Sequence, residues 1–216
     1  DIQLGAENCF FGAQHLLPQG AAPYERTLNI SNIGGGDLVV SDITFEGNGY
    51  FNTNWPGERV VIQSGGSYDL TLYYAPLAVG DHSATLHIFS NDPVDSLVNF
   101  GLYGKGVDSR DHFIHVQTGT SHSITIDEAI ITTLGGVDTP LIAGDEVAVF
   151  TPEGLCAGHR LVSQQDVDQG LIPLTAWGDD PNTNYVDGFI ARESFIFKFW
   201  DWTTRDQLNM DIVEFT

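Results

Sequence analysis

Apolar and polar residues alternate along most of this chain. Residues 68–74 carry apolar side chains at the even positions, and residues 84–88 repeat the pattern. A period of two is typical of a β-strand with one buried face. Similar patterns predict further strands at residues 27–31, 38–45, 59–63, 97–102, 112–117, 123–131, 146–150, 157–162, 171–176, 194–202 and 210–215. No long segment has helical spacing, and the nearest, residues 163–170, predicts a loop or one helical turn.

Turns rich in Gly, Asn and Asp separate these predicted strands, at residues 34–37, 47–49, 64–66, 91–93, 135–136 and 179–182. Short strands spaced about ten residues apart, with such turns between them, are typical of β-sandwiches. The predicted fold class is therefore all-β. Glycines and charges interrupt two strand-rich blocks, which predicts two tandem sandwich domains at 1–106 and 111–216, joined by a linker at 107–110.

The net charge excludes several classes of partner. The 216 residues include 8 Lys and Arg against 29 Asp and Glu, a formal charge of −21, and 18 of the acids lie in residues 108–216. Such a field repels phosphate groups, which excludes nucleic acid and anionic membrane surfaces. The apolar runs are too short for membrane insertion. Proteins, cations and glycans remain, and the acidity alone fits adaptation to salt, divalent cations or a solubilising surface.

The first block contains motifs that occur together in a known family. They are residues 28–38, 74–76, 80–86 and 90–93, followed by Leu-Tyr-Gly-Lys-Gly at 102–106. This pattern resembles the Hydin-like immunoglobulin-fold family, also called ASH or major-sperm-protein-like domains. The resemblance implies a sandwich of about seven strands without catalytic residues. Asn32 and Asn91 stand where their amides would cap turns.

Motifs of the second block, at residues 144–150, 154–158, 174–181, 187–189 and 197–201, resemble a small β domain of large exported bacterial proteins. That resemblance implies an extracellular or cell-surface location and names no activity.

A turn-rich stretch at residues 177–188 gathers oxygen-bearing side chains. Asp179, Asp180, Asn182 and Asp187 offer the carboxylate and amide oxygens that Ca²⁺ prefers, although their spacing differs from that of an EF-hand. The sequence therefore predicts a possible calcium site. The alternative is that these side chains cap turns by accepting backbone N–H bonds.

Aromatic residues gather near the same stretch. Trp177, Tyr185, Trp200 and Trp202 would form a glycan-binding platform if their rings were exposed, because sugar rings stack on aromatic faces. Packing into the core of the sandwich is the alternative.

Cys9 and Cys156 lie 147 positions apart. A disulfide within the chain, a disulfide between copies and two buried free thiols all remain open. The chain has no nucleophile elbow, no phosphate-binding loop and no His spacing typical of a zinc site.

These observations predict a non-enzymatic extracellular structural or adhesive module. It would self-assemble through exposed edge strands, or dock to other surface proteins, as a subunit of a surface fibre. The alternative is a carbohydrate-binding module that uses the C-terminal aromatic residues.

Overall fold

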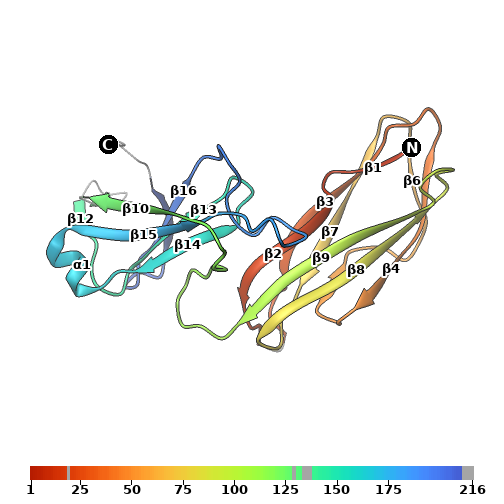
Figure 1. Cartoon of the computed structure of the whole chain (residues 1–216). Helices are drawn as coiled ribbons and strands as arrows, with labels where there is room; N and C mark the ends of the chain where they lie inside the picture. Colours follow the sequence, from red (N-terminus) through yellow and green to blue (C-terminus); the bar gives the residue numbers. More distant parts are fainter. Residues whose placement is uncertain (19, 128–129, 133–137, 211–216) are drawn as a thin grey trace. The chain divides into compact units, whose positions relative to one another are not determined.

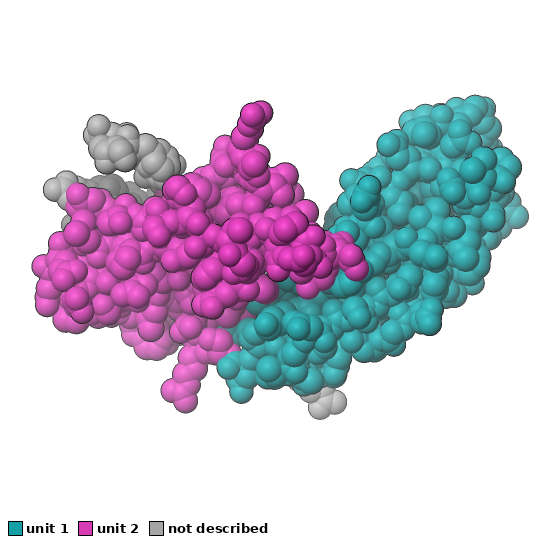
Figure 2. Space-filling model, in the orientation of Figure 1, with its two compact units in different colours: residues 1–108 teal, residues 109–216 magenta. Residues whose placement is uncertain are grey.

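The computed structural model describes residues 1–18, 20–127, 130–132 and 138–210. The chain divides into two compact units, Asp1–Asp108 (unit 1) and Ser109–Thr216 (unit 2), shown in Figure 2. This division lies inside the linker predicted from the sequence. Among the described residues, no helix has the length and hydrophobicity needed to cross a bilayer.

Unit 1 consists of strands arranged in two sheets (Figure 1). The first sheet has the order β1-β3-β7-β5, and the second has the order β2-β9-β8-β4-β6. The strands are β1 (Ile2–Leu4), β2 (Asn8–His15), β3 (Tyr24–Asn32), β4 (Leu38–Gly47), β5 (Phe51–Thr53), β6 (Val60–Ile62), β7 (Ser67–Tyr74), β8 (Gly80–Ser90) and β9 (Leu97–Val107). All pairs are antiparallel except β2 with β9, which is parallel.

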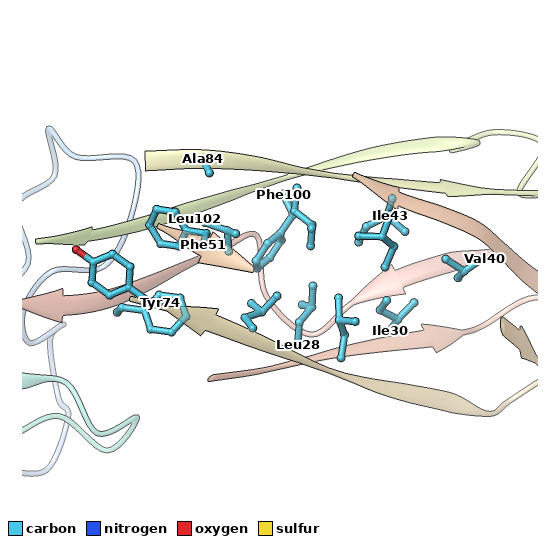
Figure 3. Close-up of a cluster of buried hydrophobic side chains, with 14 of the residues drawn as sticks. Leu28, Ile30, Val40, Ile43, Phe51, Tyr74, Ala84, Phe100 and Leu102 are labelled. Atoms are coloured by element: carbon cyan, nitrogen blue, oxygen red, sulfur yellow. The ribbon is translucent and has the colours of Figure 1, made fainter. Parts of the chain in front are cut away.

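The core of unit 1 comes from the alternation seen in the sequence. In β7, Leu70, Leu72 and Tyr74 are fully buried, while the residues between them are only partly so. Phe11 and Phe100 belong to the same buried cluster, which lies between the two sheets (Figure 3). Unit 1 is therefore an immunoglobulin-like β-sandwich, and the predicted all-β class is confirmed.

The glycines of the motif at 102–106 have a packing role. A Cβ on Gly104 would lie 2.6 Å from the Tyr74 ring, so only glycine allows this strand to pass the buried tyrosine. The Tyr74 hydroxyl lies 2.7 Å from Nδ1 of His82, and burial raises the pKa of Tyr74. The cap predicted at Asn32 is present, since Asn32 Oδ1 accepts the N–H of Gly34 at 3.0 Å. Asn91 does not cap its own turn; its Oδ1 accepts the N–H of Val39 at 2.7 Å, 52 positions away.

Unit 2 is also built from strands. A four-stranded sheet has the order β14-β13-β16-β17, and two-stranded sheets pair β10 with β15 and β11 with β12. The elements are β10 (Ser121–Asp127), β11 (Ile130–Thr132), β12 (Asp138–Pro140), β13 (Glu146–Phe150), β14 (Cys156–Leu161), α1 (Gln164–Gln169), β15 (Leu171–Trp177), β16 (Ile196–Trp200) and β17 (Gln207–Met210). Its core packs the four-stranded sheet against β15, through the buried residues Val147, Val149, Phe197, Phe199, Ile172, Leu174 and Ala176.

The short helix α1 forms where the sequence allowed one helical turn. Ser163 Oγ accepts the N–H of Asp166, and the Asp166 carboxylate accepts the N–H of Ser163, which together make a capping box. Gly170 ends the helix in the left-handed conformation, at φ 67°.

The strand predicted at residues 112–117 is wrong. Those residues form no strand, because the backbone N–H groups of His112 and Phe113 donate to the buried carboxylate of Glu146, at 2.6 and 2.8 Å. The Glu146 carboxylate on β13 thus accepts the backbone hydrogen bonds that a neighbouring strand would otherwise accept. The sequence also missed β1, β2, β5, β12 and most of β17, and the single strand predicted at 123–131 covers the two strands β10 and β11. Of the strand predicted at 210–215, all but Met210 lies outside the described residues.

Candidate protein-binding edge

Strand β10 occupies the outer position of its sheet and lies beside β15 (Figure 1). Its seven residues pair with β15 without a register shift, from Ser121 opposite Trp177 to Asp127 opposite Leu171. Within the described part of the chain, no strand pairs with the other side of β10. The outer side of β10 is therefore the candidate binding edge.

The register shows which backbone groups face outward. The carbonyl of Thr120 accepts the N–H of Gly178 at 2.9 Å, and hydrogen-bonded positions recur at every second residue of an antiparallel pair. The even-numbered residues of β10 therefore bond to β15. Pro173, which has no N–H, lies opposite the odd-numbered Thr125 and agrees with this assignment. The N–H and C=O groups directed at the outer side are those of Ser121, Ser123, Thr125 and Asp127.

The side chains of β10 leave this edge accessible. The odd-numbered side chains are exposed, whereas Ile124 and Ile126 pack against the core of unit 2. The strand contains no Lys, no Pro and no bulge, which are the usual features that protect an edge from further pairing.

The other side of β15 faces β14. A Cβ on Gly158 of β14 would lie 1.9 Å from the carbonyl oxygen of Thr175 in β15. Glycine is therefore required where the two strands meet. Strand β14 belongs to the four-stranded sheet and is not hydrogen-bonded to β15, but its close approach crowds that side of β15, whereas the outer side of β10 has no such neighbour among the described strands.

The edges of unit 1 contrast with β10. Strands β1, β5 and β6 have three residues each. The longer edge strand β2 has a register shift between Phe10 and Ala13, where Gly12 has φ 77°. Strand β4 (Leu38–Gly47) pairs with β6 only up to Val40, so among the described strands its outer side is open beyond that residue, next to a register shift between Val40 and Asp42. Short strands and bulges discourage strand addition, so the regular seven-residue pairing of β10 favours it as the binding edge.

The predicted calcium ligands accept hydrogen bonds from the backbone. Asp187 Oδ1 accepts the N–H of Asp180 at 2.9 Å, and Asp179 Oδ1 accepts the N–H of Asp187 at 3.0 Å. Asp180 Oδ1 accepts the N–H of Asn182 at 2.9 Å. Burial raises the pKa of Asp187. These bonds are the turn caps of the alternative interpretation.

No group of three or more His, Cys, Asp or Glu side chains that could hold a metal ion is found among the residues described. Calcium binding by this loop stays a prediction.

The predicted glycan-binding aromatics are placed in several settings. Trp200 on β16 stacks on the His112 imidazole, with ring centres 3.7 Å apart. Trp202 is 52% exposed, and the Arg205 guanidinium lies 4.1 Å from its ring centre. Trp177, at the end of β15, stacks on His115 at 6.4 Å, and Tyr185 is half-buried. Each of these three tryptophan rings therefore packs against a His or Arg side chain. Glycan binding by these residues stays untested.

Sequence reasoning missed a pair of histidines in unit 2. Nδ1 of His115 lies 2.8 Å from Nδ1 of His159, and Nε2 of His159 lies 3.5 Å from Asp111. Burial, together with the charge of His159, lowers the pKa of His115 to about 4. His115 is therefore neutral at physiological pH. These two histidines are 44 positions apart, so no local motif pointed to them.

Both cysteines are free thiols, with Cys9 in unit 1 and Cys156 in unit 2. Burial raises the pKa of Cys9 to about 11 and that of Cys156 to about 12. Neither thiol would form a reactive thiolate at neutral pH. A disulfide between Cys9 and Cys156, within one chain or between copies, stays untested.

The chain matches no protein-family profile and no curated protein. Solved structures similar to it include the ASH/PapD-like domain 7 of human CEP192, at 12% identity over 50% of this chain and 87% of that domain, with a TM-score of 0.42. SSP-19, an MSP-domain protein of Caenorhabditis elegans, has 15% identity over 47% of this chain and 97% of its own, with a TM-score of 0.33.

The Pseudomonas aeruginosa CupB2 chaperone has 12% identity over 96% of this chain and 98% of its own, with a TM-score of 0.36. Likenesses at these identities and scores identify neither a family nor a function. The chain is all-β, and its first unit is an immunoglobulin-like sandwich. In its second unit, strand β10 pairs on one side only, as far as the described residues show.

Proposed function

We propose that this chain is a non-enzymatic, extracellular assembly module of a surface structure. It binds copies of itself or other surface proteins by adding a strand to the outer side of β10. The observation that carries the proposal is the seven-residue edge with outward N–H and C=O groups at four positions. Such a row is a template for an incoming strand, as in other cases of β-augmentation.

Two further features support this function over catalysis. Desolvation raises the pKa of both cysteine thiols, and burial is the main cause that lowers the pKa of His115 to about 4. A thiol with a raised pKa carries little thiolate at neutral pH, which disfavours cysteine nucleophilic chemistry. The charge of −21 supports an exterior setting, because carboxylate-rich surfaces remain soluble at high salt, where repulsion is screened.

The substitution Thr125→Pro tests strand addition. It removes one N–H from the outer side of β10 and leaves the bonds to β15 in place, since Thr125 lies opposite Pro173 in a position that does not bond to β15. Thr125→Val is the matched control, because it changes the side chain and keeps the N–H. Unchanged melting curves would show that both variants fold.

The measurement is light scattering with negative-stain imaging, from 0.05 to 1 M salt. Assemblies should form with the wild type and Thr125→Val and should be lost, or weakened at least tenfold, with Thr125→Pro. A wild-type chain that stays monomeric under every salt condition contradicts the proposal, and so do assemblies that Thr125→Pro leaves intact.

A further inference from the structure

We infer that the strand added to β10 is β10 of a second copy, antiparallel and centred on Ile124, so that two chains form a two-fold symmetric dimer through unit 2. This inference rests on the proposed function and specifies its partner and register.

The directions of the backbone groups select the register. Only odd-numbered residues of β10 direct N–H and C=O groups outward, so hydrogen-bonded pairs between two copies must join odd-numbered residues. Pairing Ser121 with Asp127 and Ser123 with Thr125 satisfies this condition and places Ile124 opposite itself. All seven residues of each strand are then paired, and about eight hydrogen bonds form across the new interface.

Side chains in this register are compatible. On the exposed face, Asp127 of one copy lies opposite Ser121 of the other, and Ser123 lies opposite Thr125, so all four positions are polar. On the core-facing side, Ile124 meets Ile124 and Ile126 meets His122. β-Branched residues at such positions pack well across paired strands.

Charge explains why this segment can self-associate in so acidic a chain. Across its seven residues, β10 carries one acid, Asp127, and one titratable base, His122. The two Asp127 side chains lie at opposite ends of the pairing and face serines. The remaining charge repels the two copies at longer range, so higher salt should strengthen the dimer.

Cysteine cross-linking tests this register. Position 123 of one copy lies opposite position 125 of the other, at a Cα separation of about 5.5 Å that a disulfide can span. Position 123 lies diagonal to its own equivalent, at about 7–8 Å, which is beyond good disulfide geometry. A mixture of Ser123→Cys and Thr125→Cys chains should therefore cross-link under mild oxidation several-fold more than either variant alone. The wild type, which keeps Cys9 and Cys156, is the blank.

The outcomes separate this inference from the proposed function. Cross-linking in the mixture, together with a dimer mass that Thr125→Pro abolishes, supports both. Assemblies that Thr125→Pro abolishes but that give no selective 123–125 cross-link would overturn the self-pairing and retain strand addition by a different segment. A dimer insensitive to Thr125→Pro would overturn both.

Discussion

Asp166 should contribute measurably to the stability of unit 2, because its carboxylate joins α1 to β14. Arg160 donates from Nε and Nη2 to this carboxylate at 3.0–3.2 Å, and Ser163 donates both its N–H and its hydroxyl at 2.8 Å. The Asp166 side chain is 5% exposed. The Arg160 hydrogen bonds are the main cause that lowers its pKa from 3.8 to about 2.

This lowering of the pKa gives the expected magnitude. Each pKa unit corresponds to about 1.4 kcal/mol, so the ionised carboxylate stabilises the folded state by roughly 2 kcal/mol at neutral pH, allowing for solvent around the partly exposed Arg160. Because the folded pKa lies below the unfolded pKa, this contribution is complete above about pH 4. It falls to roughly half near pH 3 and is lost as the pH drops through 2.

Asp166→Asn should therefore lower the unfolding free energy at pH 7 by about 2 kcal/mol and by about half as much at pH 3. Urea unfolding followed by tryptophan fluorescence measures this in a Trp55→Phe background, in which the remaining tryptophans all belong to unit 2. Asp168→Asn is the matched control, because Asp168 accepts an exposed bond from Gln164 at 2.9 Å. An equal loss at both pH values, or an equal loss in the control, would refute the reasoning.

Three further predictions concern unit 2. Glu146→Gln should cost about 1–3 kcal/mol in urea unfolding, since one of the two carboxylate oxygens that accept from His112 and Phe113 becomes an NH2 group, which cannot accept. If the lost bond is that of His112, the Trp200 fluorescence should shift, because Trp200 stacks on the His112 ring. Gly158→Ala should lower the unfolding free energy by at least about 3 kcal/mol, because the added Cβ clashes with the Thr175 carbonyl. The control Gly119→Ala, with no atom within 4 Å of the added Cβ, should change it by under about 0.5 kcal/mol. A tolerated Gly158→Ala would contradict the close approach of β14 and β15. The pKa of His115 is lower in the folded chain than its ordinary value of 6.5, so between about pH 6.5 and 4 the unfolded chain binds a proton at this position that the folded chain does not. The unfolding free energy should therefore decrease as the pH is lowered through this range. Urea unfolding at pH 7 and pH 4.5 should show a smaller decrease for His115→Gln than for the wild type, and equal decreases would exclude this role.

The sequence predicted most of the long strands because burial imposes a period of two on them. In β7 and β8 the alternation is nearly perfect, and both strands form where it occurs. It failed at residues 112–117, whose pattern resembles a strand but whose first two N–H groups donate to Glu146. That carboxylate is 33 residues away from Phe113, so no local pattern could reveal the bond.

The sequence predicted that exposed edge strands exist but did not identify β10 as one of them. The sequence gives the composition of residues 121–127, but which strand lies at the margin depends on the pairing of β15 and on Gly158, far along the chain. The capping of turns by Asp179 and Asp187 could be predicted from the local sequence, because these hydrogen bonds join residues that are close together in the chain. Predicting which strand self-associates requires the order of strands in the sheets, and the alternation of apolar and polar residues does not reveal that order.

A symmetric pairing of β10 has a consequence for the fibre proposal. A two-fold interface is isologous and closed, so it consumes the edge on both copies and ends at a dimer. Growth into a fibre then requires a second contact elsewhere on each chain. The outermost strands of unit 1 are short or bulged, which disfavours strand addition there. The second contact would have to use another surface, such as the outer side of β4 beyond Val40 or a face of either unit, and its absence would leave a dimeric module as the complete assembly.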